Sequence, residues 1–170
     1  MAEPLSIATV SLAGGGRLGI CRLPGLTGDL ASDVRAIVDW KPRIVVSMTE
    51  QAEMERHGGG DLARLLAGAS IEWHHLPIRD YGEPQNASRD AWPKLAAHLH
   101  EVLDARGAIL LHCHGGRGRS GMIALRLLVE RGEDANSALA RLRSARPHAV
   151  ETEAQLAWAS AGSTNPWKPA

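Results

Sequence analysis

The sequence predicts an α/β fold in which helices flank a central, mostly parallel sheet. Short runs of strand-forming residues at 43–48, 71–78 and 108–112 alternate with longer amphipathic stretches. The runs at 43–48 and 108–112 are apolar at successive positions, which is typical of strands buried on both faces. The chain has 170 residues, of which 44% are hydrophobic, and this suits one domain. We expect that domain to span residues 1–161, followed by a flexible C-terminal tail at 162–170.

Glycines and prolines divide the N-terminal half into short elements. Apolar stretches at 5–10 and 18–21 flank three glycines at 14–16, which predicts a hairpin at a sheet edge. The apolar residues of 29–40 share one helical face, and Pro42 ends that helix. Residues 50–67 are polar and then amphipathic, with a break at the glycines of 58–60.

The C-terminal half is predicted to be mainly helical. Residues 80–87 form a loop containing Gly82 and Pro84. The next helix extends to Arg106, and we expect it to begin near Asp90 because Pro93 belongs in a first turn. Residues 120–131 are apolar on most helical faces, which predicts a central helix. Two further helices are expected at 134–146 and 151–161.

Charge and cysteine content exclude several classes of function. The chain has 19 basic and 19 acidic residues, so no electrostatic attraction to nucleic acid is expected. No apolar run approaches the roughly 20 residues that cross a bilayer, and the N-terminus lacks the pattern of a signal peptide. Two cysteines are too few for a disulfide framework. We therefore expect a monomeric cytoplasmic protein without a membrane span.

The most informative segment is the loop at 112–121, with the sequence HCHGGRGRSG. It joins a predicted buried strand to the predicted central helix, the position where parallel sheets bind ligands. The start of a helix presents unpaired N–H groups and the positive end of its dipole, and three glycines allow the loop to curl around an anion. The planar guanidinium of Arg119 suits two oxygens of a tetrahedral phosphate.

Cys113 is the first residue of this loop. The N–H groups, the helix dipole and Arg119 all stabilise a thiolate, so the pKa of Cys113 is expected to fall below that of a free thiol. The spacing Cys-x5-Arg therefore predicts a nucleophile at the floor of an anion cradle, aimed at phosphorus.

Three other interpretations of the loop are weaker. An ATP-binding P-loop ends in Gly-Lys-Ser/Thr, whereas this loop carries Arg119. A metal site built from Cys113 and the histidines at 74, 75, 112 and 114 leaves the loop glycines and arginines unexplained. An inert buried cysteine has no need of neighbouring arginines.

The loop resembles the signature of the cysteine-based protein tyrosine and dual-specificity phosphatases. The resemblance extends to Leu23-Pro24-Gly25, the strand RIVVSMTE and the segment HHLPIRD at 74–80. These occur in the order found in the kinase-associated and compact dual-specificity phosphatases, and they cover residues 18 to 160. The resemblance implies the phosphatase fold, with the signature loop at the floor of the site.

The resemblance also implies catalytic roles. Cys113 attacks phosphorus and forms a phosphocysteine, while Arg119 stabilises the transition state. Ser120 hydrogen-bonds the departing sulfur, and His112 orients the loop. No metal or cofactor takes part. The family's phosphate-binding positions fall on His114, Gly115, Gly116, Arg117, Gly118 and Arg119.

Asp80 occupies the position of the family's general acid, and the chemistry requires such a group to protonate the leaving oxygen. Glu83 in the same loop is the competing acid, and capping of a turn is the structural alternative for Asp80. Gln155 matches a glutamine that positions the hydrolytic water in some relatives, whereas Glu151 replaces another. For Gln155, a solvated helix face is the alternative.

The resemblance suggests phosphomonoesters of proteins as substrates, on tyrosine, serine or threonine. With one tyrosine, Tyr81, and no phenylalanine, the chain is expected to form a shallow site. His114 and Arg117 resemble basic residues of phosphoinositide 3-phosphatases, so phosphoinositides or inositol phosphates are an alternative. A non-catalytic phospho-binding module is a second alternative, although it would not need Asp80. Arsenate reduction or sulfur transfer is a more distant one.

Overall fold

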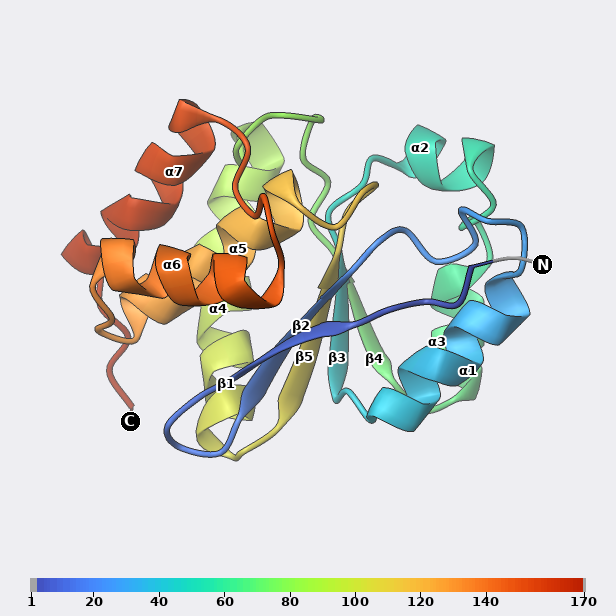
Figure 1. The fold of residues 1–170 in the computed structure, drawn as a ribbon, viewed down its shortest axis with the longest axis horizontal. Coiled ribbons are helices and arrows are strands. Elements are labelled where there is room, and N and C mark those ends of the chain that lie inside the picture. Colours follow the sequence, from blue (N-terminus) through green and yellow to red (C-terminus); the bar gives the residue numbers. More distant parts are fainter. Residues whose placement is uncertain (1–2, 170) are drawn as a thin grey trace.

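The computed structural model describes residues 3–169 as one sheet between two layers of helices (Figure 1). The sheet contains five strands in the order β1-β2-β5-β3-β4. The β1–β2 pair is antiparallel and the other three pairs are parallel. The predicted fold class is thereby confirmed. The strands are β1 (Ala8–Ser11), β2 (Arg17–Cys21), β3 (Ile44–Ser47), β4 (Glu72–His75) and β5 (Ala108–His112).

The helices are divided between the two faces of the sheet, with α1 to α3 on one side and α4 to α7 on the other (Figure 1). Within residues 3–169, no helix combines the length and apolar character needed to cross a membrane. The helices are α1 (Leu30–Trp40), α2 (Gln51–Arg56), α3 (Leu62–Gly68), α4 (Asn86–Asp104), α5 (Gly118–Glu130), α6 (Ala135–Ala145) and α7 (Glu153–Ser160), followed by the 3-10 helix η1 (Ala161–Thr164).

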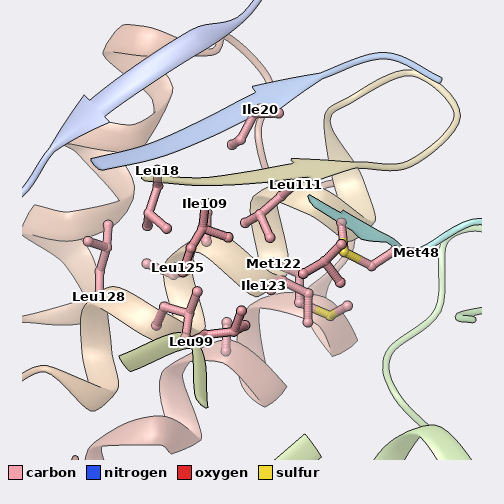
Figure 2. Packing of buried hydrophobic residues seen from close by; sticks show 14 of the residues in the cluster. Leu18, Ile20, Met48, Leu99, Ile109, Leu111, Met122, Ile123, Leu125 and Leu128 are labelled. Atoms are coloured by element: carbon pink, nitrogen blue, oxygen red, sulfur yellow. The ribbon is translucent and has the colours of Figure 1, made fainter. Parts of the chain in front are cut away.

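The central strand β5 divides the core into two clusters by the alternation of its side chains. Ile109 and Leu111 face α4 to α7, whereas Leu110 faces α1 to α3. Figure 2 shows the larger cluster, in which Leu125 and Leu128 of α5 point toward the strands. Both faces of β5 are thus covered, which explains why its sequence is apolar at successive positions.

Helix α5 is buried along its whole length, from Gly118 to Glu130. It packs between the sheet, α6 and α7 (Figure 1). The prediction of a central helix is confirmed, and the helix begins two residues earlier than expected. Its first turn directly follows the glycine-rich loop.

Helix α4 differs from the prediction at its N-terminus. It begins at Asn86, so Pro93 lies inside the helix and not in its first turn. The buried Ser88 fixes the early start, because its hydroxyl donates to the carbonyl of Pro77 at 2.6 Å. Proline removes one N–H donor, and the tertiary contacts of this long helix outweigh that loss.

The segment after α7 packs against α4 and α5. Trp167 stacks on His100 with the ring centroids 5.0 Å apart, and its indole N–H donates to Asp104 at 2.9 Å. Its backbone N–H donates to the carbonyl of Glu130 at 2.7 Å. The flexibility expected for residues 162–170 and the domain boundary at 161 stay predictions.

Candidate active site

The loop between β5 and α5 lies where the carboxyl ends of β2, β3 and β5 meet, because Cys21 and Ser47 are both in register with His112. The surrounding protein binds the carbonyl groups of this loop. The carbonyl of His114 accepts from the backbone N–H of Leu23 at 2.9 Å.

The next carbonyls are held in the same way. The guanidinium of Arg146 donates to the carbonyls of Gly115 and Gly116, each at 2.7 Å. The carbonyl of Arg117 accepts from the N–H groups of Gly121 and Val150. Because successive carbonyls are engaged by groups outside the loop, its N–H groups face the interior of the loop, as an anion nest requires.

Gly116 is required by this geometry. It has a φ of 70°, and a Cβ atom there would lie 2.5 Å from the carbonyl oxygen of Cys21. A side chain at this position would therefore force the loop away from β2 and open the nest.

Cys113 lies at the base of the loop with 3% of its surface exposed. Its Sγ atom is 3.0 Å from the hydroxyl of Ser120, which is fully buried in the first turn of α5. The Ser120 hydroxyl can donate to a thiolate there, and the helix dipole favours the same charge. The predicted pair of nucleophile and hydroxyl is therefore brought together.

Arg119 is 1% exposed, and its guanidinium is fixed by Glu53 of α2. The two carboxylate oxygens of Glu53 accept from Nη1 and Nη2 at 2.8 and 2.9 Å. Nη1 also donates to the carbonyl of Ile78 at 2.9 Å. Among the described side chains, Nε of Arg119 is one of two buried polar atoms without a partner, the other being Thr49 Oγ1. An oriented donor without a protein partner is what a phosphate oxygen needs.

The charges of this pair reinforce one another. Burial would lower the pKa of Arg119, but the hydrogen bonds to Glu53 and the nearby Cys113 raise it above its usual range. Burial would likewise raise the pKa of Glu53, but its hydrogen bonds from Arg119 hold it below its usual range. Both groups therefore stay ionised at neutral pH.

Glu53 is not among the site residues predicted from the sequence. Its local signal is the capping box of α2, in which Glu53 accepts from the backbone N–H of Glu50 at 2.8 Å. Helix α2 follows the buried strand β3, so a carboxylate in its first turn lies near the carboxyl end of that strand. Ligands bind at this edge of parallel sheets. The sequence does not show that Arg119, 66 residues later, meets it there.

Asp80 lies at the mouth of the site with its side chain 56% exposed, and its Oδ1 is 3.3 Å from Nη2 of Arg119. It also caps its own turn, accepting from the N–H of Tyr81 at 3.0 Å. The carboxylate of Glu83 instead accepts from the side chain of Gln85 at 3.4 Å. Of the two candidate acids, Asp80 is the one in contact with Arg119.

His112 is buried behind the loop and is held as a neutral ring. Nδ1 is 3.2 Å from the carbonyl of Cys113, which only accepts, so Nδ1 carries the proton. Nε2 then accepts from the hydroxyl of Ser47, which in turn accepts from the indole of Trp73 at 2.8 Å. Burial and the charge of Arg119 lower the pKa of His112 to about 4.

The two basic loop positions lie differently. The His114 ring packs edge-on against His57, with the centroids 4.8 Å apart. Arg117 is exposed and borders a hollow of about 550 Å³ together with Arg143 and His148. The two predicted phosphate-binding side chains therefore face different surroundings.

Gln155 is fully buried, so the alternative of a solvated helix face is wrong. Its amide oxygen caps α7 by accepting from the N–H of Glu151 at 2.9 Å, and its amide nitrogen donates to the carbonyl of Gly82 at 3.1 Å. Gln155 thus ties α7 to the loop that carries Asp80. The sequence missed this because the partner is distant in the chain.

Residues 25–158 match the family described as "Swiss Army Knife protein, DSP-PTPase phosphatase domain". The chain is also similar to mouse cyclin-dependent kinase inhibitor 3, with 29% identity over 116 residues, or 65% of this chain and 54% of that protein. The chain therefore spans about half the length of this relative. A putative tyrosine phosphatase of invertebrate iridescent virus 3 is 33% identical over 93 residues, which are 51% of this chain and 38% of the viral protein.

Solved structures agree with the family match. A crystal structure of kinase-associated phosphatase with a serine substituted for its catalytic cysteine superimposes with a TM-score of 0.81 and 25% identity, and covers 94% of both chains. The active form of Tk-PTP gives a TM-score of 0.68 at 25% identity, over 85% of this chain and 90% of that chain. The chain accordingly belongs to the dual-specificity branch of the cysteine-based protein tyrosine phosphatases.

Proposed function

We propose that the chain hydrolyses phosphomonoesters of phosphorylated proteins through a phosphocysteine formed on Cys113. One observation carries the proposal: Arg119, whose buried Nε has no partner, lies close to Cys113, and Cys113 contacts the hydroxyl of Ser120. A nucleophile, an oriented cation and an inward-facing nest are what phosphoryl transfer requires.

In the first step, the Cys113 thiolate attacks phosphorus and forms the S–P bond as the bond to the leaving oxygen breaks. The loop N–H groups and Arg119 bind the three equatorial oxygens, where negative charge accumulates. Asp80, protonated at this stage, donates its proton to the leaving oxygen. Its exposed position at the mouth suits a leaving group that points out of the cradle.

In the second step, water attacks the phosphocysteine and the S–P bond breaks. Asp80, now ionised, accepts a proton from this water. The electron pair returns to sulfur, and the hydroxyl of Ser120 stabilises the thiolate by hydrogen bonding. The products are inorganic phosphate and the dephosphorylated hydroxyl group, and every protein group involved comes from one copy of the chain.

The open mouth supports substrates on tyrosine, serine and threonine. Tyr81 is 62% exposed beside Asp80, where its ring is available to a bound peptide. Phosphoinositides are the alternative, because Arg117 and Arg143 border the neighbouring hollow. A reducing compartment such as the cytoplasm belongs to the proposal, because the nucleophile must remain a free thiol.

The test is metal-free hydrolysis in EDTA of a phosphotyrosine peptide, a phosphothreonine peptide and a soluble phosphoinositide. We expect turnover of the peptides, none by Cys113→Ser, and about a 10²-fold lower rate for Asp80→Asn.

Glu83→Gln is the matched control, because it removes a carboxylate from the same loop without touching Arg119. A wild-type rate for Asp80→Asn with a slow Glu83→Gln would exchange the roles of these acids. Activity in Cys113→Ser would rule out the phosphocysteine. Binding of vanadate without turnover would leave a phospho-binding module, and preference for the phosphoinositide would favour the alternative substrate.

A further inference from the structure

A second cluster of reactive side chains lies away from the phosphatase site, between β4 and α4. Its members are Glu72 and His74 of β4 and His98 of α4. Glu72 and His74 are two residues apart on a strand, so their side chains project from the same face of the sheet. Helix α4 places His98 opposite them.

The three side chains aim their ligand atoms at one another. Nε2 of His74 and Nε2 of His98 lie 2.6 and 2.7 Å from the same oxygen of Glu72. All three ligand atoms are within 4.8 Å of one another. One carboxylate oxygen of Glu72 therefore lies between the two imidazole nitrogens.

We propose that Glu72, His74 and His98 form a binding site for a zinc ion. Two imidazole nitrogens and one carboxylate oxygen are a common donor set for Zn²⁺, which binds each at about 2.0–2.2 Å. Tetrahedral geometry then places neighbouring donors about 3.4 Å apart. The exposed Glu72 side chain reaches that separation by withdrawing less than about 1 Å from each ring. The two imidazole nitrogens lie within 4.8 Å of each other, and rotation of the partly exposed rings brings them to the same separation.

The surroundings of the cluster fit a metal site with an open position. A carboxylate oxygen of Glu101 lies 3.9 Å from Nδ1 of His98, on the side of the ring opposite Glu72. This separation is longer than a hydrogen bond, so Glu101 contributes negative charge beside the ring and does not fix its orientation. His74 and His98 also border a hollow of about 420 Å³, which leaves room for a water molecule as fourth ligand.

The neighbouring His75 is excluded from the site. Its Nε2 is 2.7 Å from the carbonyl of Thr49, and its ring stacks on Trp73. The bound ion would join β4 to the middle of α4. The loop that carries Asp80 connects these two elements, so the ion would limit the movement of β4 relative to α4.

The experiment measures Zn²⁺ binding by isothermal titration calorimetry with the untagged Cys113→Ser chain. This background removes the thiol of the phosphatase site, which is itself a zinc ligand when ionised. We expect one ion per chain, and a rise in the thermal midpoint that saturates with the same stoichiometry. His98→Gln and Glu72→Gln should each weaken binding at least about tenfold.

His148→Gln is the matched control, because it removes an exposed histidine that borders the hollow beside Arg117. It should leave the affinity unchanged.

Absence of Zn²⁺ binding by the Cys113→Ser chain would overturn the proposal. Equal affinities of the His98→Gln, Glu72→Gln and His148→Gln variants would overturn it as well. Two variants on different elements are used so that a local change in α4 alone does not decide the result, and circular dichroism checks that each keeps the fold. None of these readouts depends on phosphatase activity.

Discussion

Helix α5 carries two buried arginines seven residues apart, and both are paired with a glutamate. Arg126 is satisfied by the protein: its Nε donates to Glu130 at 2.8 Å, and Nη1 donates to the carbonyl of Trp158 at 2.6 Å. Arg119 is held as firmly by Glu53, but its Nε has no partner.

The difference distinguishes an ion pair that the protein completes from one that leaves a donor without a protein partner. The carboxylate of Glu130 also binds His100 at 2.9 Å and Trp92 at 3.1 Å, so that cluster is complete without a ligand. A buried donor without a hydrogen-bond partner lowers the stability of the fold. A ligand that accepts a hydrogen bond from it accounts for its presence. The locations of the two arginines agree with this difference, because Arg119 lies in the first turn of α5 beside the loop and Arg126 lies nearer its C-terminus.

The substitution Arg119→Lys is expected to have the largest effect of those considered. Lysine keeps the charge but lacks the planar fork that binds Glu53 and a phosphate oxygen together. We expect kcat/KM to fall at least about 10³-fold, with little change in the thermal midpoint. Arg126→Lys is the matched control and should keep most of its activity. Similar losses in the two variants would show that both arginines act through stability.

Glu130→Gln tests the structural side of the comparison. Removing this charge leaves Arg126 buried without its counter-ion, which typically costs about 3–5 kcal/mol of stability. Urea unfolding measures the loss, and kcat/KM of the remaining folded protein should be close to that of the wild type. An unfolding free energy equal to the wild-type value would contradict the prediction.

His112 resembles Arg126 in being satisfied by the protein: it adjoins Cys113, and both of its ring nitrogens have partners. Its folded pKa of about 4 is below the unfolded value of 6.5, so the unfolded chain binds more protons between these pH values. The stabilising contribution is complete above about pH 6.5 and is lost as the pH falls toward 4, by about 3 kcal/mol in total.

The measurement is the unfolding free energy of wild type and His112→Asn between pH 7 and 4.5. The variant lacks the titrating ring. The slope of its unfolding free energy with pH should therefore correspond to up to about one fewer proton taken up on unfolding than in the wild type. If the unfolding free energies of the two proteins had the same pH dependence, burial of the neutral His112 ring would not contribute to the pH dependence of stability.

Glu53→Gln tests whether the clamp on Arg119 matters for catalysis. The amide cannot accept from both guanidinium nitrogens, so Arg119 loses its fixed orientation. We expect about a 10²-fold lower kcat, since small displacements of a catalytic group have effects of that size. Glu55→Gln, on the exposed face of the same helix, should behave as wild type. Rescue of activity by Glu53→Asp would support positioning, whereas an unchanged kcat in Glu53→Gln would exclude it.

Much of the fold could be predicted because its signals are local. The hairpin around the glycines, the buried strands and the central helix each follow from a few adjacent residues, and the structure agrees on all of them. The early start of α4 was not predicted. Pro93 is visible in the local sequence, whereas the hydrogen bond from Ser88 to the carbonyl of Pro77 forms only in the folded chain.

The local sequence is enough to bring the candidate loop residues together. Cys113, Arg119 and Ser120 lie within eight consecutive residues, so a strand, a nest and a helix start necessarily bring them together. The side chains that contact these residues from elsewhere in the chain follow from the packing of whole elements. Glu53 on Arg119, Gln155 on the Asp80 loop and His98 beside Glu72 each join segments far apart in the chain. Periodicity and spacing specify neighbours along one element, whereas these contacts depend on how whole elements pack around the sheet.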